Sequence, residues 1–325
     1  LIVALRSASM SAPNITAVVL NTNRKDDTLA CLQALAGSRY PELHVIVLDN
    51  HSTDGSPEAI RSAFPDVTVV QLERNLGYAG NNNVGIQLAL ESGADWIFVE
   101  NEDTLVEPGC FEAMIATAQA NPRIGVIGPL VYTFDPGRII SSGGGRVRWS
   151  VADAENVAMG AEDHGQLSAG PVDFINGCGL LISREAVKRV GGLDESFFIY
   201  FEETDWCQRV RKAGFEVWFE PRAVMRHKAP ITWVGFGPST LYYMTRNRIR
   251  FFARHTPWPQ WPLTVARALR GAWRGAAQHE RAGRPEHARA TRIAIRHALQ
   301  QRWGKVDPNL WKTDTGDRTL AHPTG

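Results

Sequence analysis

The sequence has few cysteines and no long hydrophobic run. Four cysteines occur among its 325 residues, and no two of them form a Cys-x-x-Cys pair, which argues against a zinc ribbon or a disulfide framework. We therefore expect reduced and mostly buried thiols. No stretch reaches the roughly 18 apolar residues that a transmembrane helix needs, and the opening run Leu1–Leu5 lacks the basic start and cleavage pattern of a signal peptide. These absences predict a cytoplasmic protein.

Charge is distributed unevenly along the chain. The net charge is only +1, but residues 246–325 contain 16 Lys or Arg against 5 Asp or Glu, whereas the rest of the chain contains 19 against 29. With 44% hydrophobic residues, the chain is long enough for one large domain, or for a domain with an appendage. We predict an acidic catalytic body with a basic tail.

The first half alternates short β-branched runs with helical patterns, which predicts an α/β fold with a mainly parallel, doubly wound sheet. The expected strands are Ile15–Leu20, His44–Leu48, Val67–Leu72 and Trp96–Val99. The expected helices between and after them are Asp26–Ala36, Ser56–Ala63, Tyr78–Leu90 and Pro108–Ala120.

After Gly128 the pattern becomes glycine-rich and strand-like, which predicts a mixed sheet with a surface excursion over residues 153–170. The triplet Gly143–Gly145 has no Walker lysine, so we expect a turn there and no phosphate loop. The rest of the core is predicted to contain a strand at Cys178–Ile182, helices at Ser183–Val190 and Glu203–Ala213, and a strand at Glu216–Phe219. A helical tail is predicted from Ser239 onward.

Oxygen-bearing side chains follow the strand at Trp96–Val99. Asn101 and Asp103 are one residue apart, so they would share a face at the carboxyl end of that strand. Ligands gather at this edge of an open α/β sheet, and Mg²⁺ and Mn²⁺ prefer oxygen ligands with a substrate phosphate as partner. The pattern indicates a metal site, although an Asx turn or the cap of a helix opened by Pro108 would give the same residues.

Polar turns also follow the first two strands. Residues 21–24 and 49–56 carry short polar side chains beside helix starts, an arrangement that suits a nucleotide base, ribose or phosphate. The segment Arg74–Asn83 opens the next helix with small and amide residues, so a ligand could approach its backbone closely. Ordinary turn chemistry explains each segment equally well.

A second acidic cluster marks the start of the helix predicted near Glu203. A carboxylate with aromatic neighbours at a helix start could act as a general base, although acidic residues are common there because they complement the helix dipole. His227 follows a strand-like stretch and precedes a loop, residues 228–238, that could form a lid. His227 itself is either a hydrogen-bonded structural histidine or a metal ligand.

These motifs, taken in order, resemble the bacterial rhamnosyltransferase-like branch of the family 2 inverting glycosyltransferases. The resemblance covers roughly residues 14–255 and implies a GT-A fold, with a Rossmann-like sheet flanked by helices. It depends on seven motifs and a following histidine: Val19–Arg24, Val47–Ser56, Asn75–Gly80, Glu100–Asp103, Gly177–Arg184, Gly191–Phe198, Phe201–Trp206 and His227.

The resemblance implies a catalytic domain at residues 14–238, with a nucleotide-binding half at about 14–128 and an acceptor half at about 129–238, followed by a helical basic region at 239–325. The residues that it assigns to the nucleotide-sugar donor are Thr22, Asn23, Asp49, Arg74, Asn75, Gly80 and Asn101. Asp49 would contact the base, and Asn101 with Asp103 would match the metal-binding Asp-x-Asp triplet.

The same resemblance gives roles to the acceptor side. Asp103 and His227 would hold Mg²⁺ or Mn²⁺, and Glu203 would be the catalytic base, with Glu202 and Asp205 flanking it to orient the acceptor. Three positions depart from the family pattern: Asn101 replaces an Asp, Glu102 occupies a middle position that often holds Pro or Asp, and Glu203 stands where Asp is common. The longer Glu side chain leaves open whether Glu203 or Glu202 takes the proton.

The implied reaction is a single displacement from a nucleotide-diphosphate sugar, with dTDP-L-rhamnose favoured as donor and a glycan or polyprenyl-linked acceptor in cell-surface polysaccharide synthesis. One alternative is a non-catalytic nucleotide-sugar or glycan-binding protein on the same fold. A nucleotidyltransferase is disfavoured, because residues 21–27 do not form its Gly-, Arg- and Lys-containing loop.

The basic tail suggests a membrane contact. Arg267, Arg270 and Arg274 recur at near-helical spacing opposite Val265, Leu269 and Trp273, so this helix could lie on the inner, anionic face of the cell membrane. The alternative is a helix packed on the catalytic domain. Nucleic-acid binding is disfavoured, because no recognised nucleic-acid-binding fold accompanies the charge.

Overall fold

The computed structural model describes residues 12–134, 137–228 and 236–312. The chain divides into two compact units. The first comprises residues 1–149 and 153–233, and the second comprises residues 150–152 and 234–325. Each unit is described by itself.

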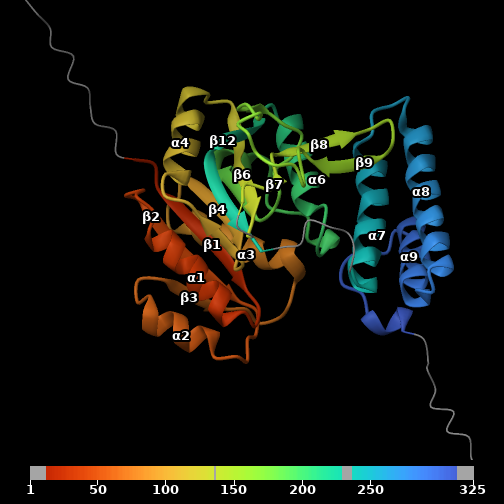
Figure 1. Cartoon of the computed structure of the whole chain (residues 1–325), viewed down its shortest axis with the longest axis horizontal. Coiled ribbons are helices and arrows are strands. Elements are labelled where there is room, and N and C mark those ends of the chain that lie inside the picture. Colours follow the sequence, from red (N-terminus) through yellow and green to blue (C-terminus); the bar gives the residue numbers. More distant parts are fainter. Residues whose placement is uncertain (1–11, 135–136, 229–235, 313–325) are drawn as a thin grey trace, which may run out of the picture. The chain divides into compact units, whose positions relative to one another are not determined.

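The first unit is built on a mixed sheet whose N-terminal half is parallel (Figure 1). Strands β1 (Ile15–Asn21), β2 (Leu43–Asp49), β3 (Thr68–Gln71) and β4 (Trp96–Asn101) lie in the order β4-β1-β2-β3. All three pairings between them are parallel. Because the carboxyl ends of parallel strands share one edge, the turns after β1, β2 and β4 meet there.

Antiparallel pairing begins at the other side of β4. Strand β11 (Gly179–Ser183) runs antiparallel between β4 and β6 (Ile124–Thr133), and β6 pairs in parallel with β12 (Glu216–His227). Short strands β5 (Thr104–Val106) and β10 (Gly170–Pro171) pair with β12, and β7 (Ile140–Ser142) pairs with β6. Strands β8 (Gly145–Arg148) and β9 (Asp153–Asn156) form a separate hairpin.

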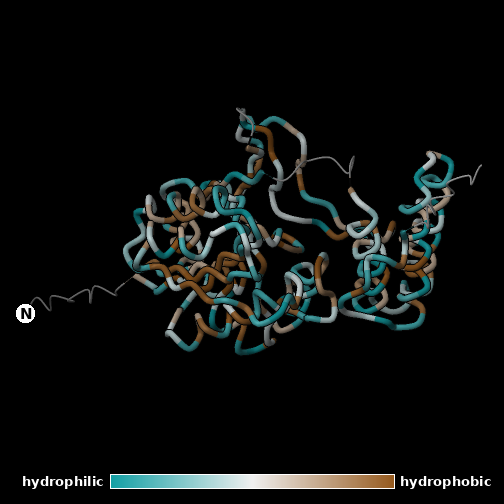
Figure 2. The backbone as a smooth tube through the Cα atoms, turned by 90° about the horizontal axis from the view of Figure 1, so that it is seen from below, coloured by the Kyte–Doolittle hydropathy of each residue, from teal (hydrophilic) through white to brown (hydrophobic). Residues whose placement is uncertain are grey.

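Helices cover the sheet and follow its strands. Those of the first unit are α1 (Lys25–Ala36), α2 (Ser56–Ala63), α3 (Gly77–Glu91), α4 (Cys110–Ala120), α5 (Arg184–Val190), a 3₁₀ turn η1 (Glu195–Phe197) and α6 (Glu202–Lys212). The hydrophobic stretches gather in the strands of this unit (Figure 2). Strands β1 and β4 supply a core in which Val19, Phe98 and Phe111 are fully buried, as expected for strands covered on both faces.

The predicted fold class is confirmed, and most elements lie within two or three residues of their predicted bounds. The helix expected from Pro108 begins at Cys110, and the strand expected at Glu216–Phe219 continues to His227. Strand β5 was not predicted, because three residues are too few for a periodic signal. The turn expected at Gly143–Gly145 is present between β7 and β8, where Gly144 has a φ of +81°. All four cysteines are free and buried, as predicted.

The second unit is helical, as predicted for the tail. It contains α7 (Pro238–His255), α8 (Trp261–Arg281), α9 (Pro285–Leu299) and a 3₁₀ turn η2 (Pro308–Trp311). Inside it, the Tyr242 hydroxyl lies 2.7 Å from Nδ1 of His297, and the buried Arg246 donates a 2.7 Å hydrogen bond to the Gly304 carbonyl. Within the described residues, every helix is too short or too polar to cross a membrane.

Candidate active site

The site begins where β4 leaves the core. Ile97, Phe98 and Val99 are fully buried, and after Asn101 the chain turns back through β5, which pairs with the end of β12. In that pairing His227 lies opposite Thr104, and the Lys228 amide donates a 3.0 Å hydrogen bond to the Asp103 carbonyl. The β5–β12 register therefore brings the end of β12 to the turn that carries Asp103.

Asp103 and His227, the two predicted metal ligands, lie side by side. Nε2 of His227 is 3.2 Å from Oδ1 of Asp103, and their side chains are 12% and 14% exposed, respectively. A carboxylate, an imidazole and the nearby Asn101 amide are a donor set that suits Mn²⁺ or Mg²⁺. Among the residues that the structure describes, no group of three or more His, Cys, Asp or Glu side chains is arranged to hold a metal. Donor phosphate oxygens would have to complete the coordination.

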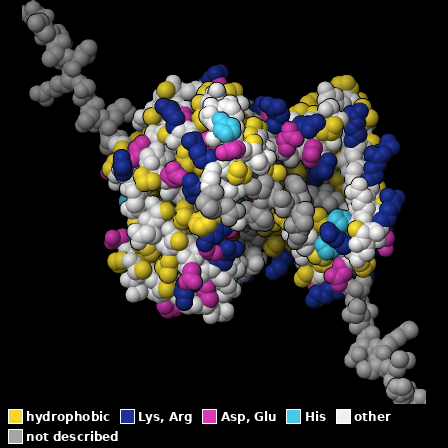
Figure 3. Space-filling model, viewed as in Figure 1, with side chains coloured by type: hydrophobic (Ala, Val, Ile, Leu, Met, Phe, Trp, Pro, Cys, Tyr) yellow, Lys and Arg dark blue, Asp and Glu magenta, His cyan; other side chains and the backbone are white. Residues whose placement is uncertain are grey.

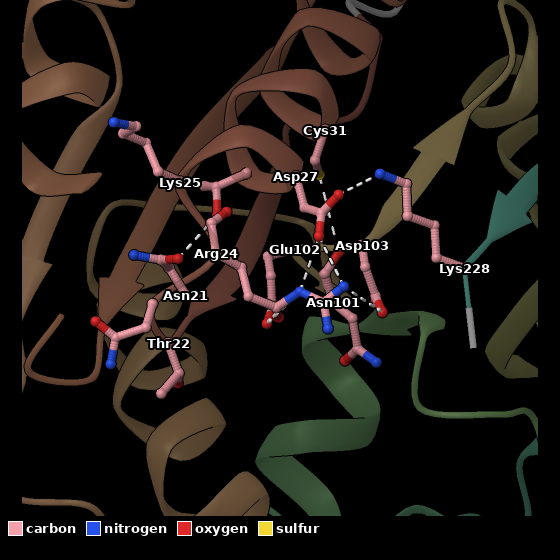
Figure 4. Close-up of polar contacts among 12 residues, drawn as sticks. Asn21, Thr22, Arg24, Lys25, Asp27, Cys31, Asn101, Glu102, Asp103 and Lys228 are labelled. Atoms are coloured by element: carbon pink, nitrogen blue, oxygen red, sulfur yellow. Dashed lines mark hydrogen bonds and ion pairs between the residues drawn. The ribbon is translucent and has the colours of Figure 1, made fainter. Parts of the chain in front are cut away.

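Two cations, Arg24 and Lys228, lie near Asp103 (Figure 4). Arg24 donates to Asp27 and lies 3.9 Å from Glu102 and 3.8 Å from Asp103, and Lys228 pairs with Asp27. These cations balance the carboxylates that a divalent metal would otherwise neutralise. Neither was predicted as a site residue, although Arg24 ends the first motif.

The electrostatics of the pair follow from its burial. Burial would raise the pKa of Asp103, but the hydrogen bond and charge of His227, with the charge of Arg24, hold it below its ordinary value. Burial would lower the pKa of His227, whereas Cys178 and Asp103 raise it to about 10. The imidazole is therefore protonated at neutral pH before any metal binds, and metal binding there must release its proton.

Glu100 is a fully buried carboxyl beneath the Asn101–Asp103 turn. Thr104 Oγ1 lies 3.0 Å from its Oε2 and also 2.8 Å from the Asn101 carbonyl. Burial raises the pKa of Glu100 to about 8, in spite of contacts with Thr104 and Cys31. The Thr104 hydroxyl can donate either to Glu100 or to the Asn101 carbonyl, so it connects the buried carboxyl with the turn.

The ends of β1 and β2 form the second part of the site. Asp49 is fully buried, where it accepts a 2.8 Å hydrogen bond from Asn21 and a 3.1 Å bond from the Ser52 amide. Asn21 is also buried and accepts from Thr28 in α1. This network fixes the floor of the pocket expected for a nucleotide base.

Thr22 and Asn23 lie exposed above that floor. Thr22 accepts a 3.3 Å hydrogen bond from Asn50, and Asn23 Oδ1 accepts a 2.7 Å bond from the Thr53 amide. Asn23 has a φ of +53°, a left-handed conformation that asparagine tolerates. Both side chains are accessible at the carboxyl edge of the sheet.

The segment that opens α3 is used mainly for packing. A Cβ on Gly77 would lie 2.3 Å from the Phe198 carbonyl oxygen, and one on Gly80 would lie 2.5 Å from Leu76 Cβ. Asn83 donates to the Leu193 carbonyl and accepts from the Leu193 amide. The start of α3 lies close to the loop before α6, and this close packing accounts for the small residues. The order of residues in the sequence does not reveal it.

Two residues of that segment remain outside the packing. Arg74 and Asn75 are exposed, whereas Gly80 is buried. Asn75 accepts a 2.8 Å hydrogen bond from the Gly77 amide. Arg74 and Asn75 thus remain available to a ligand, whereas Gly80 packs against Leu76.

The acidic cluster lies at the start of α6. Glu202 is buried, and its Oε2 has no hydrogen-bond partner among the described residues. Burial, followed by the charge of Glu203, raises the pKa of Glu202 well above its ordinary value. Glu203 is half-buried, and burial raises its pKa as well, against hydrogen bonds from its own amide and from Thr204. A raised pKa improves a carboxylate as a proton acceptor near neutral pH.

Asp205 differs from its two neighbours. It is fully buried, and its Oδ2 lies 2.8 Å from Nε of Arg209, whose other nitrogens donate to the Val190 and Gly192 carbonyls. Arg209 thereby connects Asp205 of α6 with the loop that precedes the helix. The predicted role of Asp205 in orienting the acceptor stays a prediction.

Tyr78 and Cys178 connect the acidic cluster with the Asp103–His227 pair. The Tyr78 hydroxyl donates a 2.6 Å hydrogen bond to the Gly177 carbonyl. Its pKa is raised by burial and then by the charges of Glu202 and Glu203, so these acids lie near it. The next residue, Cys178, interacts with His227. No periodicity in the sequence indicated either residue.

Comparisons with known proteins find similar sequences and similar folds. A sequence model of the family described as glycosyl transferase family 2 matches residues 16–191. The chain is 31% identical over 264 residues to the N-acetylglucosaminyl-diphospho-decaprenol L-rhamnosyltransferase of Mycobacterium tuberculosis, a match that covers 74% of this chain and 84% of that protein.

Two further matches extend the comparison. The dTDP-rhamnosyl transferase RfbF of Shigella flexneri is 24% identical over 218 residues, covering 66% of this chain and 69% of that protein. In structure, the mannosyltransferase PcManGT from Pyrobaculum calidifontis, solved with GDP-Man and Mn²⁺, aligns with a TM-score of 0.58 at 18% identity. That alignment covers 90% of this chain and 88% of the other, and it shows a shared fold.

Proposed function

Because this chain belongs to the family 2 glycosyltransferases, we propose that it moves a sugar, with inversion, from a nucleotide-diphosphate donor to a glycan or lipid-linked acceptor in cell-surface polysaccharide synthesis. L-Rhamnose carried by dTDP is the donor we favour. Its support is the similarity to two rhamnosyltransferases. The cytoplasm, where nucleotide sugars are made, is the proposed location.

The donor occupies the carboxyl edge of the parallel strands. Asp49, held by Asn21 and Ser52, faces the base, with Thr22 and Asn23 beside it. Arg74 and Asn75 are exposed at the start of α3 and hold the nucleotide. Asn101 lies between this part of the site and Asp103.

The single observation that carries the proposal is the 3.2 Å approach of His227 to Asp103 at the edge where a donor diphosphate would lie. These residues would hold Mg²⁺ or Mn²⁺, which, when bound, neutralises charge on the departing diphosphate. Arg24 and Lys228 add positive charge at the same edge.

Glu203 accepts the proton of the acceptor hydroxyl as that oxygen attacks the anomeric carbon and the sugar–phosphate bond breaks. Its half-burial and raised pKa support this role. Burial raises the pKa of the neighbouring Glu202 as well, so the two carboxyls act on each other's charge state. One displacement inverts the anomeric centre and requires no covalent sugar–enzyme intermediate.

The basic helical unit is proposed to hold the protein at the anionic inner surface of the cell membrane, where a lipid-linked acceptor would reside. Its support is the excess of arginine over acidic residues from residue 246 onward.

The decisive experiment measures release of nucleotide diphosphate from dTDP, UDP and GDP sugars, with Mg²⁺ or Mn²⁺ and with glycan or polyprenyl-linked acceptors. Metal-dependent turnover of one donor is expected, with dTDP-L-rhamnose the most active. Donor binding without turnover, under any acceptor, would favour a non-catalytic nucleotide-sugar or glycan-binding protein. Turnover of a UDP or GDP sugar alone would retain the enzyme class and reject rhamnose.

A further inference from the structure

A groove of about 630 Å³ runs along the second unit between α8, α9 and η2. This volume is within the range of sites for small organic ligands. Its apolar lining includes Trp273, Leu299 and Leu310, and its basic lining includes Arg289, Arg292 and Arg296. None of its lining residues is acidic. Every residue that lines it belongs to this unit.

Three of the apolar side chains that line the groove are open to solvent, whereas Ile293 and Ile295 are buried. Leu299 is 64% exposed, Trp273 is 53% exposed and Leu310 is 38% exposed. The buried residues of α8 are Thr264, Ala268 and Ala276, which leaves Trp273 on an open face of the helix. Large apolar side chains that gather at one open groove, rather than singly, mark an interaction surface.

The arginines lie on the exposed face of α9, three and four residues apart, so they form one row. Arg292 pairs with Glu280, and Arg289 donates to the Lys312 carbonyl. Arg296 has no ion pair within residues 12–134, 137–228 and 236–312. Figure 3 shows further Lys and Arg side chains along the edge of this unit formed by α8. Positive charge therefore borders an apolar groove.

We propose that this groove docks on the surface of an anionic phospholipid bilayer, with the arginine row on the headgroup phosphates and a lipid acyl chain against Trp273, Leu299 and Leu310. Tryptophan and leucine beside arginine are the side chains that bind the interface of anionic membranes. Charge complementarity selects a phosphate-bearing lipid over a neutral one, because arginine forms paired hydrogen bonds with phosphate.

The inference deepens the membrane contact of the proposed function by naming the surface that makes it. It differs from a contact made by Arg267, Arg270 and Arg274 of α8, because those residues do not line the groove. Binding to vesicles is measured without donor or acceptor, so its failure is distinct from failure of sugar transfer.

The test is flotation of the full-length protein with vesicles of phosphatidylcholine alone or with 30 mol% phosphatidylglycerol (roughly the anionic content that attracts basic surfaces). The groove variants are Arg289→Gln/Arg296→Gln and Leu299→Ser. The matched controls are Arg281→Gln/Arg284→Gln, exposed arginines outside the groove, and Leu263→Ser, an equally large leucine that is 56% exposed.

Wild type is expected to float with the anionic vesicles and not with phosphatidylcholine. Each groove variant should bind about tenfold more weakly or worse, and the controls should stay within about twofold of wild type. If the groove variants and the control variants lose vesicle binding equally, the groove is not the docking surface, and only a diffuse basic contact with the membrane remains. No binding by wild type would overturn the membrane contact altogether, whatever the donor assay shows.

A second measurement reports on acyl-chain contact. Vesicles with brominated acyl chains should quench tryptophan fluorescence in wild type, and the quenching should fall in Trp273→Phe but not in Trp258→Phe, which removes an exposed tryptophan outside the groove. Equal quenching in wild type and Trp273→Phe would overturn acyl contact. Sedimentation without lipid completes the test, since a groove variant that converts a dimer to a monomer would assign the groove to a second copy of the chain.

Discussion

Nε2 of His227 lies 3.2 Å from Oδ1 of Asp103, although His227 ends the last strand of the sheet and Asp103 follows β4. The contact depends on the three-residue strand β5, which pairs His227 with Thr104. A very short strand thus decides whether the two proposed metal ligands meet.

Replacing either residue should weaken metal binding. In Asp103→Ala and His227→Gln we expect the apparent affinity for Mn²⁺, measured by titrating turnover and by calorimetry, to fall about 10- to 100-fold, as loss of a metal ligand or its partner commonly does. His164→Gln is the matched control, because His164 is exposed beside Glu162. Unchanged Mn²⁺ affinity in Asp103→Ala would contradict the assignment.

The His227 proton gives that binding a pH dependence. Because the pKa of His227 is raised to about 10, metal binding below that pH must displace a proton, and affinity should rise with pH by up to about tenfold per pH unit. Calorimetry in buffers of different ionisation enthalpy should detect close to one proton released per metal. In His227→Gln the affinity for the metal should no longer depend on pH. If the pH dependence persists in this variant, the released proton comes from another group.

The proposed base makes a separate prediction. Glu203→Gln should reduce kcat about 10²- to 10⁴-fold with little change in donor affinity, because the amide cannot accept the acceptor proton. Glu58→Gln, an exposed acid in the first turn of α2, should retain activity. If Glu202→Gln loses activity while Glu203→Gln keeps it, Glu202 is the catalytic base and Glu203 is not.

The sequence predicted the position of the strand-end residues better than the position of the two cations beside them. Four parallel strands have strong apolar runs, and their ends place Asp49, Asn101 and Asp103 at one edge by topology alone. The position of Lys228 depends on the β5–β12 pairing, whereas Arg24 lies in the turn after β1. Their contacts with Asp27 and Asp103, respectively, join residues far apart in the chain and leave no periodic trace. For the same reason the small residues of α3 suggested a ligand, whereas the loop at Phe198 occupies that space.

Glu100 should make stability depend on pH. Its pKa is about 8 in the folded protein and about 4.5 when exposed, so the folded state holds the proton more tightly between these values. Stability due to this group is therefore full below about pH 4.5 and is lost as pH rises towards 8, by an amount on the order of a few kcal/mol.

Glu100→Gln should remove this loss, because the amide stays neutral and still reaches Thr104. Urea unfolding in EDTA at pH 5 and pH 8 measures the effect. The gain of Glu100→Gln over wild type should be larger at pH 8, whereas Glu91→Gln, an exposed site on α3, should show no such difference. A gain that is the same at both pH values would mean that Glu100 does not titrate in this range.

Two helical glycines should respond oppositely to alanine. A Cβ at Gly275 of α8 meets nothing within 4 Å, whereas a Cβ at Gly85 of α3 would lie 2.3 Å from Val18 Cγ1 and 3.0 Å from Leu48 Cδ1. Gly275→Ala should therefore stabilise the second unit by about 0.5–1 kcal/mol through helix propensity. Gly85→Ala should destabilise the first unit by about 1–3 kcal/mol through overpacking against β1 and β2. Hydrogen exchange resolves the two units separately, and stabilisation by Gly85→Ala would show that α3 does not pack against β1 and β2 as closely as these distances require.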